Sequence, residues 1–116
     1  MNIKLIAEEK ITISELKEIA QEFYITMIKG AVDIEKGIVV FGGEYHIDAS
    51  AFLTEKTGSK SDDIWGFNIY LDQPKEEWIE YRALINIKPV HGNRSMIISD
   101  KKIRDRIQTL VNSKIE

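Results

Sequence analysis

The 116-residue chain contains no cysteine. Disulfide bonds, thiolate nucleophiles and cysteine-ligated zinc are therefore excluded, and a bound metal would need histidine and carboxylate ligands. No apolar run approaches the roughly 18 to 20 residues that span a membrane. Glu8 and Glu9 stand where the apolar part of a secretory signal would lie. We therefore expect a soluble, cytoplasmic protein that does not enter a membrane.

The composition is that of one globular domain. Hydrophobic residues make up 43% of the chain and charged residues 30%, and no internal repeat or low-complexity tract interrupts it. A chain of this length buries one core without disulfides or structural metals. We expect a single globular domain over residues 1–116, and no cofactor.

The charge is divided unevenly along the chain. Residues 1–81 hold eight Lys or Arg against sixteen Asp or Glu, whereas residues 82–116 hold eight against three. A basic end on an acidic body can pair within the molecule, with a second copy, or with an anionic ligand. Nucleic acid is a poor candidate partner, because the net charge is −3 and Trp65 and Phe67 alternate like core residues.

Two segments have the spacing of amphipathic helices. Thr12 to Glu15 has the form of a capping box, and Gly30 is the expected end of the helix that follows. The apolar residues of this helix are Ile13, Leu16, Ile19, Ala20, Phe23 and Met27. Asp100 is the expected cap of a second helix with an apolar stripe. That stripe consists of Ile103, Ile107, Leu110, Val111 and Ile115.

Alternating or β-rich segments fill the region between these helices. They lie at residues 3–6, 31–34, 38–41, 44–49, 64–71, 79–87 and 95–98, while residues 51–56 fit either a strand or a helix. The sequence therefore predicts an α+β fold, with an antiparallel or mixed sheet of about five strands and both helices packed on one face. The other face would be polar. It would carry Glu44, His46, Asp48, Asn68, Arg82 and Asn86.

The segment from Glu44 to Asp48 is a candidate metal site. On a strand, the side chains of Glu44, His46 and Asp48 point to one face, and imidazole and carboxylate groups suit zinc, manganese or iron. Three alternating polar residues also occur on any solvated strand. A divalent metal and an ordinary wet surface both remain open here.

The segment from His91 to Ser95 is a candidate anion site. Gly92 lets the backbone approach a ligand, and His91, Asn93, Arg94 and Ser95 offer donors. The basic start of the last helix adds Lys101, Lys102, Arg104 and Arg106. The alternative is a hairpin turn in which Gly92 and Asn93 adopt positive φ. Asn68 and Asn86 on the predicted polar face complete the candidate ligand-binding set.

Four sequence words resemble those of a family of small prokaryotic proteins of unknown function. They are Gly42–His46, Asp63–Tyr70, Leu84–Ile87 and Gly92–Met96. The resemblance extends from about Met27 onward. It implies a free-standing small soluble protein and carries over no catalytic residue.

Two functions follow as hypotheses. The first is a binding module for a small anionic ligand or a protein partner, with self-association into a homo-oligomer. The second is a metal-dependent hydrolase or an acid–base enzyme, in which His46 is the base or a metal ligand between Glu44 and Asp48. No spacing in the chain matches a catalytic signature that decides between them.

Overall fold

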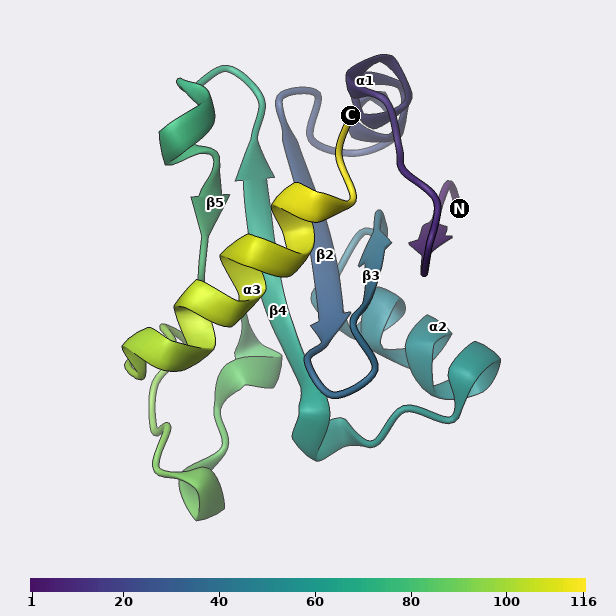
Figure 1. Cartoon of the computed structure of the whole chain (residues 1–116). Helices are drawn as coiled ribbons and strands as arrows, with labels where there is room; N and C mark the ends of the chain where they lie inside the picture. The colour runs from purple at the N-terminus through teal and green to yellow at the C-terminus, as the bar shows by residue number, and fades with distance from the viewer.

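Five antiparallel strands form one sheet in the computed structural model, which describes residues 1–116 (Figure 1). In sheet order they are β1 (Lys4–Ile6), β3 (Ile38–Phe41), β2 (Met27–Asp33), β4 (Ile64–Tyr70) and β5 (Ile79–Glu80). Three α-helices accompany the sheet, namely α1 (Ile13–Gln21), α2 (His46–Thr57) and α3 (Lys101–Ser113). None of them is long and apolar enough to cross a membrane. The predicted α+β class is confirmed.

The central strands β2 and β4 fix which residues face which side. Their register pairs Lys29 with Asn68 and Gly30 with Phe67. A Cβ atom on Gly30 would lie 2.4 Å from Phe67 Cζ, so glycine here lets the ring pack directly on the neighbouring strand. Alternation sends the Phe67 ring to one face of the sheet, and Lys29 and Asn68 to the other.

Helices α1 and α3 cover the Phe67 face, as predicted. Thr12 Oγ1 accepts a hydrogen bond from the Glu15 amide at 3.1 Å and Glu15 Oε1 accepts one from the Thr12 amide at 3.4 Å, which confirms the capping box. The apolar stripes of both helices join the sheet in one core of 18 buried residues. The predicted end of the first helix at Gly30 is wrong. Helix α1 ends at Gln21, because the chain from Met27 onward pairs with β4.

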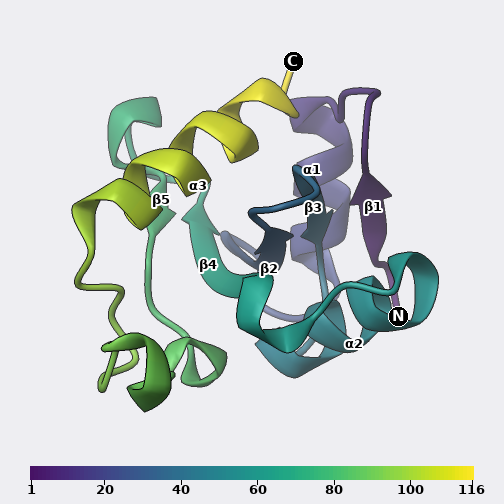
Figure 2. The same cartoon turned by 60° about the horizontal axis from the view of Figure 1, so that its bottom comes forward.

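Helix α2 covers part of the opposite face, and Figure 2 shows the sheet between it and the other two helices. The prediction of a strand at residues 44–49 is therefore wrong, and residues 51–56 are helical. Asp48 Oδ2 accepts hydrogen bonds from the backbone N–H groups of Glu44 (3.1 Å) and Tyr45 (2.9 Å), and so fixes the chain where it enters the helix. Ala49 and Leu53 then pack in a second core with Ala31, Val40 and Ile64. The prediction of a wholly polar face is wrong for the same reason.

Residues 82–97 form an irregular loop instead of the predicted strands at 79–87 and 95–98. Beyond β5, the only pairing within this stretch consists of isolated bridges from Arg82 to Ile97 and from Lys88 to Asn93. Two short 3₁₀ turns, Leu84–Asn86 and Pro89–His91, interrupt it. We call residues 82–97 the 82–97 loop. It stands beside the sheet face that α2 leaves uncovered.

Candidate functional site

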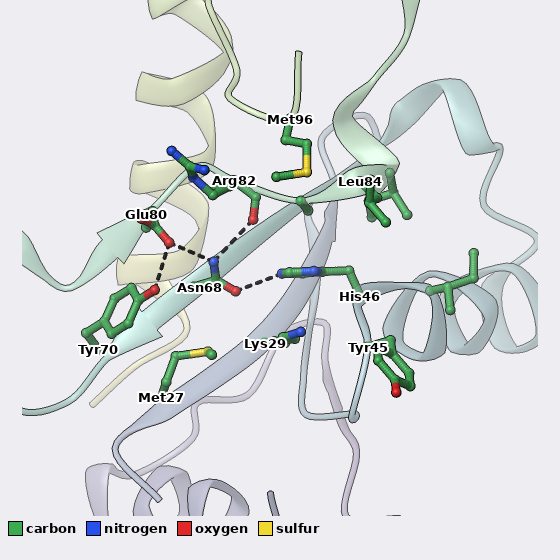
Figure 3. Close-up of a pocket in the computed structure, with 13 residues that line it drawn as sticks. Met27, Lys29, Tyr45, His46, Asn68, Tyr70, Glu80, Arg82, Leu84 and Met96 are labelled. Atoms are coloured by element: carbon green, nitrogen blue, oxygen red, sulfur yellow. Dashed lines mark hydrogen bonds between the residues drawn. The ribbon is translucent and has the colours of Figure 1, made fainter. Parts of the chain in front are cut away.

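A cleft of about 440 Å³ lies on the α2 side of the sheet, between the start of α2, strands β2, β4 and β5, and the 82–97 loop (Figure 3). This volume is within the range of small-molecule sites. Its apolar walls are formed by Met27, Ile47, Leu84, Ile85 and Met96. Its polar groups belong to Lys29, Tyr45, His46, Asn68, Tyr70, Glu80 and Arg82.

Asn68 lies at the centre of the polar part and is only 5% exposed. Its Nδ2 donates to Glu80 Oε1 at 2.9 Å and to the Arg82 carbonyl at 3.2 Å. Because both partners are acceptors, the amide nitrogen must lie on that side, and Oδ1 must face His46. Asn68 is the one predicted ligand-binding residue that lines the cleft.

The hydrogen bonds of His46 assign the tautomer of its neutral ring. His46 Nε2 lies 2.8 Å from Asn68 Oδ1 and 3.1 Å from the Phe67 carbonyl oxygen. Both of these atoms are acceptors, so Nε2 carries the proton and donates it. In the neutral ring Nδ1 is then the unprotonated nitrogen, and it makes no hydrogen bond within the chain.

Burial is the main cause that lowers the pKa of His46 below its ordinary value of 6.5. The hydrogen bond to Asn68 opposes this shift, and the positive charge of Lys29 adds to it. The side chain is therefore a neutral imidazole at neutral pH. It presents a free nitrogen lone pair to the cleft and no positive charge.

Glu80 and Tyr70 extend the hydrogen-bonded row on the far side of Asn68 (Figure 3). The Tyr70 hydroxyl donates to Glu80 Oε1 at 2.8 Å, so this single oxygen receives two hydrogen bonds. Burial first, and the bond to Glu80 second, raise the pKa of Tyr70, which keeps its proton in place. The row Tyr70–Glu80–Asn68–His46 is thus a fixed set of side chains on three elements of the fold.

Lys29 and Arg82 bring two positive charges to the cleft, and neither has a carboxylate partner. The ammonium group of Lys29 lies 4.9 Å from the centre of the Tyr24 ring and 5.5 Å from that of Tyr45. Cation–π contacts hold this group in place without neutralising it. The cleft contains one carboxylate, that of Glu80, beside these two cations.

The residues of the predicted metal site do not come together. No group of three or more histidine and carboxylate side chains in the structure is placed to hold a metal ion. Asp48 Oδ2 accepts from two backbone N–H groups at the start of α2, and His46 Nε2 donates to Asn68. Their arrangement on one face of a strand, on which the prediction depended, is absent because residues 46–57 are helical.

The predicted anion site separates into structural and exposed residues. Asn86 and Asn93 are buried, and their side chains bond the backbone of the 82–97 loop, of β4 and of Ser99. His91 is exposed and lies 3.3 Å from Asp62. Arg94 and Ser95 are also exposed and lie outside the cleft. In α3, Arg104 donates to two backbone carbonyls and Lys101 pairs with Asp105, so this basic end is partly neutralised locally.

Sequence reasoning missed Lys29, Tyr45, Tyr70 and Glu80 as residues of the site. Strand β2 starts at Met27, and its pairing with β4 places Lys29 opposite Asn68. The helical spacing of apolar residues from Ile13 had instead included Met27 in the predicted helix. Tyr70 shares a strand face with Asn68, and this signal was present in the alternation of β4. Glu80 is brought to Asn68 by strand pairing, which the sequence alone does not fix.

A family model described as "Protein of unknown function (DUF5674)" matches residues 5–114. The chain belongs to this family. The match covers the whole sheet apart from the first residue of β1, all three helices and every residue that lines the cleft. It agrees with the resemblance to a small family of unknown function and assigns no activity. No curated protein and no solved structure matches the chain.

Proposed function

We propose that this protein binds a small molecule that has an apolar body and an anionic group, and that the cleft beside the start of α2 is its binding site. The observation that carries this proposal is the pair of cations, Lys29 and Arg82, which have no carboxylate partner inside a cleft with mainly apolar walls. It replaces the earlier hypothesis of an anion site at His91–Ser95.

The size and walls of the cleft favour a small ligand. About 440 Å³ accommodates a molecule of drug-like or metabolite size. Ile47 is 59% exposed and Leu84 is 72% exposed, so apolar surface remains at the rim for a ligand to cover. Burying such surface contributes roughly 25 cal/mol per Å².

The charges favour an anionic group at the Lys29 end. An ammonium group held against two aromatic rings is already ordered, so a carboxylate that binds it loses little side-chain entropy. The start of α2 lies on the same side, because Tyr45, His46 and Ile47 all line the cleft. The positive end of the helix dipole adds to the attraction for an anion.

Three probes of equal chain length test the proposal, namely hexanoate, hexylammonium and 1-hexanol. Each is titrated into ¹⁵N-labelled protein and followed by the backbone amide signals. We expect hexanoate to bind most tightly and to shift the signals of Lys29, Ile47 and Asn68. Equal affinity for the three probes, or shifts centred on residues 91–95, would refute the proposal.

A matched pair of variants isolates the charge of Lys29. Lys29→Gln should weaken hexanoate binding and leave 1-hexanol binding unchanged, because only the anion uses the ammonium group. Lys60→Gln removes an exposed lysine outside the cleft and should change neither. If both variants weaken hexanoate binding equally, only the net charge of the protein acts and the site is wrong.

A further inference from the structure

The two carboxylate oxygens of Glu80 have different roles. Oε1 accepts hydrogen bonds from Asn68 and Tyr70, whereas Oε2 makes none. Only two buried side-chain polar atoms in the chain lack a partner, Asp33 Oδ2 and Trp65 Nε1. Glu80 Oε2 is not one of them although the residue is not exposed, so this oxygen is accessible to solvent, and Glu80 lines the cleft. The cleft therefore offers an ionised acceptor that the protein does not use.

His46 Nδ1 is a second unused acceptor in the same row. It has no partner and is likewise absent from the buried unsatisfied atoms, so it also faces solvent. His46 and Glu80 lie on the two sides of the Asn68 amide, one bonded to Oδ1 and the other to Nδ2 (Figure 3). Because the ring is neutral, it does not repel a cationic group that binds beside Glu80.

Negative and positive groups thus face the same cleft from strands on the two sides of β4. Lys29 lies opposite Asn68 across β2 and β4, and Glu80 lies opposite Asn68 across β4 and β5. A ligand that reaches both carries an anionic group and a cationic group on one molecule. Such a zwitterion has no net charge of its own, so it adds none to the cleft.

We propose that the ligand is an amino acid with an unbranched apolar side chain, whose carboxylate binds Lys29 and whose ammonium group binds Glu80 Oε2. This inference rests on the proposed function of the cleft and names its ligand class. The side chain of the ligand lies against Met27, Leu84 and Met96. Methionine side chains are flexible and polarizable, and they adapt to a linear chain.

The experiment adds 2-aminohexanoate to the series, since it differs from hexanoate only by the α-ammonium group. A charge-assisted hydrogen bond to an ordered carboxylate predicts that 2-aminohexanoate binds at least about tenfold more tightly than hexanoate. Its N-acetyl derivative keeps the carboxylate and loses the positive charge. We expect this derivative to bind the wild-type protein no more tightly than hexanoate does.

Glu80→Gln tests the assigned oxygen. Glutamine keeps an oxygen that accepts from Asn68 and Tyr70, and it replaces the unused Oε2 with an NH₂ group. The tenfold preference for 2-aminohexanoate over hexanoate, measured within this variant, should disappear. Glu77→Gln, at an exposed residue outside the cleft, should keep the preference.

The outcomes separate the two proposals. If hexanoate binds in the cleft and 2-aminohexanoate binds no more tightly, the amino acid inference is overturned and the proposed function stands. If neither probe binds, both fail. If the N-acetyl derivative binds as tightly as 2-aminohexanoate, the ammonium group is not recognised and the assignment to Glu80 is wrong.

Discussion

Asn86 provides the most direct test of how the cleft is built. Its side chain is fully buried, its Oδ1 accepts from the Gly66 amide at 2.7 Å, and its Nδ2 donates to the Gly66 carbonyl at 3.0 Å and to the Met96 carbonyl at 3.2 Å. Strand β5 pairs with β4 only at Asn68 and Ile69. The amide of Asn86 therefore takes the place of a missing neighbouring strand beside Gly66.

We expect Asn86→Ala to lower the free energy of unfolding by about 3 to 5 kcal/mol. The variant leaves the Gly66 N–H and C=O groups without partners, and each buried unsatisfied group costs about 1 to 3 kcal/mol. A small cavity adds to this cost. The expected loss is large beside the 5 to 15 kcal/mol or so that stabilises a typical domain.

Urea denaturation followed by tryptophan fluorescence measures this effect, since the chain has two tryptophans. The matched control is Asn112→Ala, at an exposed position of α3, which should change stability by less than about 0.5 kcal/mol. Asn86→Asp should also destabilise strongly, because its second oxygen would face two carbonyl oxygens. If Asn86→Ala costs no more than the control, the amide does not hold the 82–97 loop to β4.

Three further predictions concern other parts of the fold. Because burial lowers the pKa of His46, its contribution to the free energy of unfolding should be fully present above about pH 6.5 and should be lost as the pH falls below that value. In melting curves recorded across this pH range, the melting temperature of His46→Gln should fall less with decreasing pH than that of the wild type. The melting temperature of His91→Gln should fall as much as that of the wild type. Gly30→Ala should cost about 1 to 3 kcal/mol or more, because its Cβ meets Phe67 Cζ at 2.4 Å and the Val40 carbonyl oxygen at 2.7 Å. In Gly92→Ala nothing lies within 4 Å of the new Cβ and only the strain of the positive φ remains, so a smaller loss for Gly30→Ala than for Gly92→Ala would contradict this packing. A chelator should leave the melting temperature unchanged. If the chelator lowers the melting temperature of the wild type but not that of His46→Ala, the hypothesis of a metal site at Glu44, His46 and Asp48 is supported instead.

The elements that could be predicted were those with a local signal. The capping box at Thr12 and Glu15 and the apolar stripe of α3 depend on residues three or four apart, and both appear in the structure. The alternation of β4 fixed its two faces, because strand parity needs no knowledge of the neighbouring strands. These signals were enough for the α+β class.

Helix α2 was missed because its first residues carry the wrong signal. Glu44, His46 and Asp48 alternate with Tyr45 and Ile47, as in a half-buried strand, yet Ile47 is 59% exposed at the rim of the cleft. The signal that decides the structure is the Asp48 carboxylate, which accepts two backbone N–H groups that precede it. A carboxylate five residues after a glycine pair is too common a pattern to favour a helix over a strand.

The two buried asparagines show why the site itself was harder to predict than the fold. Asn86 and Asn93 have the residue type of a ligand contact, but in an irregular loop the backbone groups lack strand partners, and buried amides must supply them. Asn68 differs only in its location, since its strand has regular partners on both sides and its amide is left to bond His46 and Glu80. Whether an asparagine serves the backbone or the cleft therefore depends on the pairing of the strand beside it, which is a property of the assembled sheet.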